Sequence, residues 1–360
     1  MRSRQRYRLA GSFLLLSACF ARGTPELTPT IACDLNGTNS VVYCPTLQVA
    51  WDGLKDIVGG PVQMQRQDAM VLQLNGGHCP AGVIPEESHV AMAGFVKMGI
   101  ADQIKAALRV KFGDRAPLLP PILSDKDTEI FAYAHLQRSI PFPRKFLRSS
   151  TSVLRFDNGS SSTNVEYFGA SERSADDYSA QVRVLHYAGK NEFALCLTSK
   201  NADDFLVLSK MEKPPNLAAG VKQTLTYLQA EDKGFSKLEV DGKPEFFMNA
   251  LAHGDFLAIP VINLNVAAEF PQLCNRLFSN QGFERALLKQ VFQDVCFKLD
   301  ESGAVVRSTA HAAAAGGSSK PRRFVFDKPF LLTLWKKSAE QPYLAVWVAS
   351  PDVLVPFKSK

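Results

Sequence analysis

The chain has 360 residues, of which 46% are hydrophobic, 10% aromatic and 21% charged. This composition is typical of a globular protein and excludes a disordered, collagen-like or coiled-coil chain. Removing the four N-terminal arginines Arg2, Arg4, Arg6 and Arg8 from the net charge of +6 leaves +2, which is too little to indicate nucleic-acid binding. No apolar run approaches the 18 residues that a membrane-spanning helix needs.

Residues 1–19 have the features of an export signal. The N-terminal arginines are followed by a short apolar stretch, Leu9 to Leu16, and by the small residues of Leu16-Ser-Ala-Cys. This last run resembles a bacterial lipobox, which predicts that Cys19 is lipidated and begins the mature chain. The alternative is plain cleavage nearby, because Ala21 also offers a small-residue site. With or without the lipid, we expect an extracellular, periplasmic or outer-envelope protein. Lipidation at Cys19 would also anchor it to a membrane.

Six further cysteines follow, and none forms a C-x-x-C pair. The spacing therefore predicts no metal site, and no motif indicates a cofactor. The only disulfide that we consider joins Cys33 to Cys44 or Cys79. His78-Cys79 after two glycines is the one pair that resembles a nucleophilic site, but a glycine-rich turn explains it equally well. No catalytic motif is present, so the chain is not predicted to be an enzyme.

In chain order, residues 20–40 are predicted to be irregular and Val41–Tyr43 to form a strand. A helix follows from Thr46, and Gly59-Gly60 ends it. Residues 75–87 are predicted to form a loop, and a helical period predicts a helix over 87–111.

Beyond the prolines near residue 120, strand patterns dominate. Ile130–Leu136 is apolar except for His135, a near-continuous run that is typical of a strand buried on both faces. Residues 151–198 are predicted to form strands and hairpins, with Asn158-Gly159 as a turn. Further helices are predicted over 203–210, 217–229 and 281–290, and further strands over 255–266, 291–299, 326–335 and 343–348. Helices early and strands later indicate an α+β fold with large mixed sheets.

Residues 304–323 interrupt this pattern. They contain no large apolar side chain beyond two valines and lie between two strongly strand-like segments. A stretch of about 20 residues without structure inside a compact domain is uncommon and is often functional. The alternative is a flexible Ala/Gly/Ser linker.

The two flanks of this segment resemble the serpin family. Phe324-Val-Phe-Asp-Lys-Pro-Phe-Leu-Leu-Thr-Leu is similar to the family's C-terminal signature, and Phe297-Lys-Leu-Asp-Glu-Ser-Gly is similar to the strand end before its reactive loop. The spacing from Gly303 to Asp327 matches the family's loop length to within about a residue. The resemblance implies one serpin-like domain over 41–357, with helices concentrated in its N-terminal part and an exposed reactive loop at 304–323.

Weaker matches occur in the family's order. They are Val41-Val-Tyr-Cys-Pro, the stretch from Ala116 to His135, and Leu185-His-Tyr-Ala-Gly. The chain departs from the family between Pro45 and Thr128, where it is some tens of residues short. Cys44, His135 and Gln293 stand where the family tends to have Ser, Asn and His, and Phe142 replaces a usual tryptophan. We interpret His135 as a buried core residue hydrogen-bonded to Gln293.

The resemblance implies a bait-and-trap inhibitor of a serine endopeptidase, acting as a monomer. After cleavage, the loop would insert as a strand, and period 2 then decides which residues face the core. The hinge is predicted to comprise Glu301, Gly303, Ala304, Val306, Ser308 and Ala310. In the family's phase, the inward residues are Ala304, Val306, Ser308, Ala310, Ala312 and Ala314, all small or apolar. The outward residues include Val305, Arg307, Thr309 and His311.

Counting from both flanks places the scissile bond near Gly317-Ser318. The small residue Gly317 suits an enzyme with a shallow specificity pocket, such as an elastase- or subtilisin-like protease. Lys320, Arg322 and Arg323 offer an alternative cleavage site for trypsin-like enzymes. The other interpretation of these three residues is a solvated charge cluster that keeps the loop soluble. Val306 and Arg307 are bulkier than the family's usual alanines, which would slow insertion. The alternative function is therefore a non-inhibitory binding or structural protein of the same fold, whose loop is at most a protease substrate.

Overall fold

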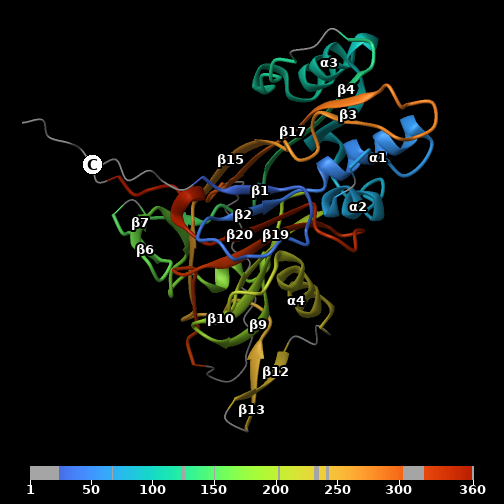
Figure 1. The fold of residues 1–360 in the computed structure, drawn as a ribbon. Helices are drawn as coiled ribbons and strands as arrows, with labels where there is room; N and C mark the ends of the chain where they lie inside the picture. Colours follow the sequence, from blue (N-terminus) through green and yellow to red (C-terminus); the bar gives the residue numbers. More distant parts are fainter. Residues whose placement is uncertain are drawn as a thin grey trace, which may run out of the picture.

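The computed structural model describes residues 24–66, 68–122, 126–149, 151–201, 203–230, 235–240, 243–302 and 320–358 (Figure 1). Its largest sheet has the strand order β1-β2-β20-β19-β11-β10-β9. These strands are β1 (Glu26–Thr28), β2 (Val41–Tyr43), β20 (Leu344–Val348), β19 (Phe330–Lys336), β11 (Asp204–Lys210), β10 (Glu192–Thr198) and β9 (Val182–Gly189).

A second sheet has the order β15-β17-β4-β3, with β16 paired to β17 beside this path. Its strands are β15 (Ile262–Glu269), β17 (Leu287–Leu299), β4 (Glu129–Ser139), β3 (His89–Phe95) and β16 (Arg276–Leu277). A third sheet has the order β18-β14-β8-β5, and there are two separate hairpins. These elements are β18 (Arg323–Val325), β14 (Phe256–Pro260), β8 (Tyr167–Ala170), β5 (Leu147–Arg148), β6–β7 (Leu154–Asp157 and Ser162–Val165) and β12–β13 (Phe235–Val240 and Lys243–Met248).

Three of the four described α-helices lie in the N-terminal third of the chain. The helices are α1 (Thr46–Val58), α2 (Ala69–Gly76), α3 (Ile100–Phe112) and α4 (Leu217–Gln229). Gly59 caps the C-terminus of α1, and its φ of 74° lies in the left-handed region that glycine adopts without strain. None of the helices in the described part of the chain is both long enough and apolar enough to cross a membrane.

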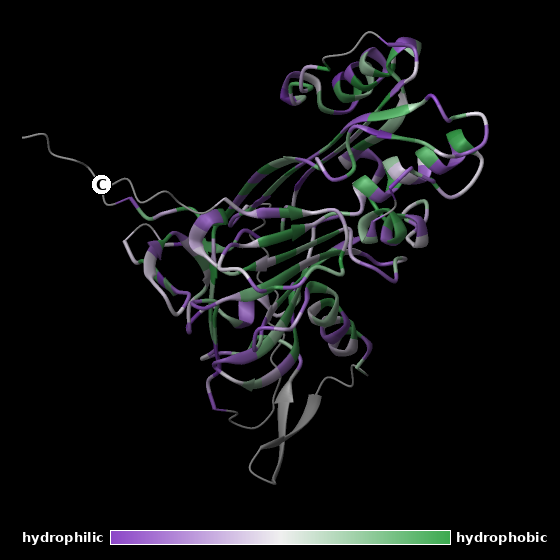
Figure 2. Ribbon diagram, viewed as in Figure 1, coloured by the Kyte–Doolittle hydropathy of each residue, from purple (hydrophilic) through white to green (hydrophobic). Residues whose placement is uncertain are grey.

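The main hydrophobic core lies between the sheets and includes the inward faces of β4, β10, β17 and β19. Two smaller clusters cover the outer faces of the sheets. One packs α4 against Val207, Leu331 and Trp347 of the seven-stranded sheet. The other packs α3 against Phe131 and Tyr133 of β4. The hydropathy pattern in Figure 2 follows this arrangement, because the central strands are apolar and the exposed loops are polar.

The fold is α+β with large mixed sheets, as the sequence pattern predicts. Strands β2, β4 and β20, helices α1 and α4, and the hairpin turn at Asn158-Gly159 all form where they are expected. Gly159 has a φ of 86°, which explains the need for glycine in this turn. The segment 20–40 is less irregular than predicted, because its described part contains β1, which pairs in parallel with β2.

Two predicted helices are wrong and a third is too long, and in each case strand pairing outweighs the local pattern. Residues 89–95 form β3, antiparallel to β4, so the helix expected over 87–111 begins only at Ile100. Residues 204–210 form β11 between β10 and β19, where both of its faces are buried. Residues 287–290, expected to end a helix, begin β17. Short apolar segments fit either period, and tertiary packing decides between them.

Candidate functional site

Strands β4 and β17 lie next to each other in parallel, and their junction is here called the seam. Its paired register runs from Leu287 opposite Glu129 to Lys298 opposite Ser139. After the carboxyl end of β17, the next described strand is β18, which belongs to another sheet. The predicted reactive loop therefore starts beside the place where β4 also ends.

A polar cluster lies on the core side of the seam. The Gln293 side-chain amide donates hydrogen bonds to the carbonyl of Cys44 (2.9 Å) and to Thr46 Oγ1 (2.8 Å). Burial raises the pKa of the Cys44 thiol to about 11, so the thiol stays protonated. The cluster ties β17 to the start of α1.

A second polar cluster lies on the opposite, α3-facing side of the seam. His135 Nδ1 contacts Asp294 Oδ1, its direct neighbour across the ladder, and Tyr133 donates to Asp294 Oδ2 at 2.7 Å. Phe112 of α3 packs edge-on against the His135 ring, 4.8 Å between centroids. Burial, followed by the charge of Asp294, raises the pKa of Tyr133, which therefore remains a donor.

His135 is fully buried, but its hydrogen-bond partner differs from the predicted Gln293. In the register, His135 is opposite Asp294, and Gln293 is opposite Ala134. Because successive strand residues point to opposite faces, His135 and Gln293 lie on different sides of the sheet. The apolar run around His135 indicates its burial, but nothing in the sequence marks this one-residue difference in register.

At the carboxyl end of the seam, Arg138 connects three segments. Its guanidinium pairs with the buried Asp204 at the start of β11, and it donates to Glu87 (2.8 Å) and to Ser88 Oγ (2.9 Å). Nearby, Phe142 is fully buried and packs edge-on against Phe146. No sequence motif marks Asp204, which only the pairing of β11 brings to this place.

The predicted hinge residue Glu301 is held at the end of β17. Its carbonyl accepts a hydrogen bond from Phe146 N (3.1 Å), and the carbonyl of Ser302 accepts one from Phe142 N (2.9 Å). The Glu301 carboxylate accepts from Arg148 at 2.8 Å. A hydrogen bond to Glu166 and the charge of Glu301 raise the pKa of Arg148, so this guanidinium remains charged.

The three basic residues that follow the loop lie in different environments. Lys320 is exposed, and Arg323 is exposed and pairs with Glu172 at 3.1 Å. Arg322 is only 5% exposed; its backbone N–H and its guanidinium both donate to Asp255, and the guanidinium also donates to the carbonyl of Ala250. Arg322 therefore does not have the exposure that a protease-recognition residue needs, which corrects that part of the alternative site.

The remaining predicted site residues lie outside the described residues. They are Cys19, the hinge residues Gly303, Ala304, Val306, Ser308 and Ala310, and the scissile pair Gly317 and Ser318.

The glycine-rich His78-Cys79 pair has no catalytic geometry. His78 Nδ1 lies 3.0 Å from Asp52 Oδ2, and the same carboxylate oxygen accepts the backbone N–H of Cys79. Burial raises the pKa of the Cys79 thiol to about 12, whereas a nucleophilic cysteine needs a lowered pKa.

All six described cysteines are unpaired, so the predicted disulfide from Cys33 to Cys44 or Cys79 does not form. Among the described residues, no cluster of His, Cys, Asp or Glu could hold a metal ion.

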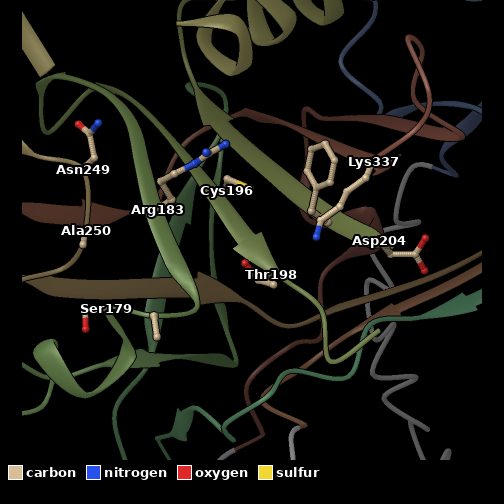
Figure 3. A pocket seen from close by; sticks show the side chains of 10 residues that line it. Ser179, Arg183, Cys196, Thr198, Asp204, Asn249, Ala250 and Lys337 are labelled. Carbon is tan, nitrogen blue, oxygen red and sulfur yellow. The ribbon is translucent and has the colours of Figure 1, made fainter. Parts of the chain in front are cut away.

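A cavity of about 510 Å³ opens at the end of the seven-stranded sheet near Asp204 (Figure 3). Figure 3 shows Arg183 of β9 directed toward Cys196 of β10, with Thr198 below and Lys337 beyond. Burial raises the pKa of Cys196 to about 11. Among the described side chains of this cavity, no hydrogen bond joins Ser179, Cys196 or Thr198 to a base, so the geometry offers no activated nucleophile.

Comparisons with known proteins agree with this geometry at the level of the fold. No family model matches the sequence, and no curated protein matches it. Solved structures do match: maspin (TM-score 0.56, 12% identity, 87% of this chain and 93% of that chain) and Manduca sexta serine protease inhibitor (serpin)-12 (0.52, 12%, 89% and 95%). Human thyroxine-binding globulin, solved in complex with thyroxine, matches with a TM-score of 0.52, 10% identity, and coverage of 88% of this chain and 93% of that chain.

Proposed function

We propose that this chain, which has the serpin fold, inhibits a serine endopeptidase by bait and trap. The protease serine attacks the carbonyl carbon of Gly317, and the amine of Ser318 leaves. The enzyme is then held as an ester on the loop. The freed loop enters the seam as a strand and carries the enzyme with it before water can release it.

The observation that carries this proposal is the parallel pairing of β4 and β17. A chain that turns back from the end of β17 runs antiparallel to β17, and therefore antiparallel to β4 as well. An inserted strand would exchange one parallel ladder for two antiparallel ladders. Antiparallel pairing is slightly more stable per residue, and the inserted backbone gains partners for its polar groups. The topology thus supplies a driving force for insertion.

The core side of the seam suits the residues that would enter it. Ala132 and Ala134 of β4 and Val291 and Val295 of β17 line this side, all buried, and Gln293 lies between the two valines, opposite Ala134. The loop positions predicted to face this side are likewise small or apolar, with Ala310 at their centre. Matching small residues allow a strand to enter without creating strain or voids.

The direct test is incubation with elastase, subtilisin and trypsin, followed by a denaturing gel. We expect a band at the summed mass of the chain and of elastase or subtilisin, less the C-terminal fragment that begins at Ser318, because the acyl bond survives denaturant. Mass spectrometry of the released C-terminal fragment should show that it begins at Ser318. Quantitative cleavage between 317 and 323 without such a band would refute trapping.

That second outcome describes the alternative function, a non-inhibitory protein of this fold. Two sequence features favour it: the β-branched Val306 and the long Arg307 near the start of the loop would slow insertion relative to deacylation. Thyroxine-binding globulin, one of the structural neighbours, was solved in complex with thyroxine. A loop that is cut but leaves no covalent complex would assign this chain to the non-inhibitory group.

We further propose that the chain is exported and carries a lipid on Cys19. In a bacterial host, we expect the mature protein to fractionate with membranes, because acyl chains bury apolar area in the bilayer. Cys19→Ala should move it to the soluble fraction, whereas Cys33→Ala should leave it on the membrane. A mature protein without lipid that begins after Ala21 would instead establish plain secretion.

A further inference from the structure

A separate cavity of about 340 Å³ lies at the end of the seven-stranded sheet where β20 finishes and β19 starts. Its walls come from the turn of the β6–β7 hairpin, the β9–β10 turn, the end of β11 and the segment before β2. The lining residues are Gly37, Thr38, Asn158, Ser160, Asn191, Lys210, Met211, Lys213, Lys328, Pro329, Trp347 and Ala349. It is distinct from the seam and from the cavity of Figure 3.

The charge of this cavity is positive. Three lysines line it, and the described lining includes no aspartate or glutamate. Lys210 is already satisfied, because its ammonium pairs with Asp327 and donates to the carbonyl of Val325 (2.8 Å). Lys213 donates only to the carbonyl of Gly37 (3.3 Å), and within the described chain Lys328 has no ionic partner. Two exposed ammonium groups at the rim are therefore available to an anion.

The surroundings strengthen this positive potential. Burial is the main cause that lowers the pKa of Lys210, and the nearby charges of Lys328 and Lys190 lower it further. These ammonium groups are thus close enough to repel one another. A bound anion would relieve that repulsion.

The floor of the cavity is apolar and contains an unmet hydrogen-bond donor. Trp347 is 1% exposed, and its indole N–H has no partner among the described residues. The other two tryptophans are satisfied: Trp51 donates to Asn75 (3.0 Å) and Trp335 to Thr333 (2.8 Å). A buried donor without an acceptor is unfavourable and therefore unusual. Met211, Pro329 and Ala349 complete the apolar part of the lining.

We propose that this cavity binds a small organic anion. Its negative group is held by Lys213 and Lys328, its apolar or aromatic body lies against Trp347 and Met211, and an acceptor atom receives the indole N–H. The volume is within the range of small-molecule pockets, and the combination of an apolar floor with a few convergent polar groups is typical of them. This site is independent of protease trapping and does not rest on it.

The test is titration calorimetry on the full chain with three probes. We expect 1-naphthoate to bind with one-site stoichiometry, the uncharged 1-naphthamide to bind at least roughly tenfold more weakly, and inorganic phosphate to bind at least roughly tenfold more weakly. Equal binding of the amide would overturn the role of the lysines. Equal binding of phosphate would overturn the role of the apolar floor, and absence of binding by all three would overturn the site.

Variants locate the binding. Lys213 and Lys328 are exposed, so replacing either with Gln should not disturb the fold. Lys213→Gln and Lys328→Gln are each expected to weaken the binding of 1-naphthoate about tenfold. Lys222→Gln, on the exposed face of α4, is the matched control and should leave the affinity unchanged. Trp347→Phe keeps an aromatic ring, removes the N–H and should weaken binding severalfold. If Lys222→Gln lowers affinity as much as the two cavity variants do, the attraction is general and the proposed site is wrong.

Discussion

Replacing Ala310 with Asp is expected to abolish the covalent complex while loop cleavage continues. In the inserted strand, residue 310 would face the core, where Ala134 of β4 lies opposite Gln293 of β17. The Gln293 amide already donates its hydrogen bonds to Cys44 and Thr46. Burying a carboxylate without a partner costs several kcal/mol, and each 1.4 kcal/mol changes a rate or equilibrium ratio about tenfold. Insertion would then lose to deacylation by at least roughly a hundredfold.

The matched control is Val305→Asp, which places the same charge in the outward set, toward the exposed end of the seam near Lys298. It should retain most of the complex. Both variants are measured with the same protease by band intensity on a denaturing gel, with cleavage followed by mass spectrometry. A complex that survives in A310D would show that the loop does not insert in the predicted phase, or does not insert at all.

Replacing Arg138 with Met is expected to lower the free energy of unfolding by about 3–5 kcal/mol. The guanidinium is the ionic partner of Asp204, which is 1% exposed. Without it, a buried carboxylate remains uncompensated, and the tie from the end of β4 to β11 and to Glu87 is lost. The measurement is the urea midpoint of unfolding, followed by tryptophan fluorescence.

Two further variants separate charge burial from loss of packing. The double variant Arg138→Met with Asp204→Asn removes both charges and should recover most of the lost stability, since coupled partners are not additive. Arg115→Met removes an exposed arginine that has no ionic partner in the described chain, and it should be neutral. A double variant as unstable as R138M would mean that packing, rather than the unpaired carboxylate, accounts for the loss.

The sequence alone was sufficient for features that are local or that repeat at a fixed spacing. The near-continuous apolar run at Ile130–Leu136 indicated a strand buried on both faces, and Asn158-Gly159 indicated a tight turn. The two motifs that flank residues 304–323 indicated the serpin fold, although no family model detects the chain. These features are predictable because strand burial, turn geometry and the two flanking motifs each depend on residues that are close together in the sequence.

Only the tertiary structure decided which strands pair and which side chains meet across them. The local sequence patterns of β3 and β11 predict helices. These segments form strands because β3 hydrogen-bonds to β4, and β11 hydrogen-bonds to β10 and β19. His135 meets Asp294 rather than Gln293 because a register is set by the whole ladder, and one residue of shift changes the face. Arg322 is buried because Asp255, 67 residues away in sequence, lies beneath it. Composition and spacing describe one segment at a time, whereas these contacts depend on how distant segments share a core.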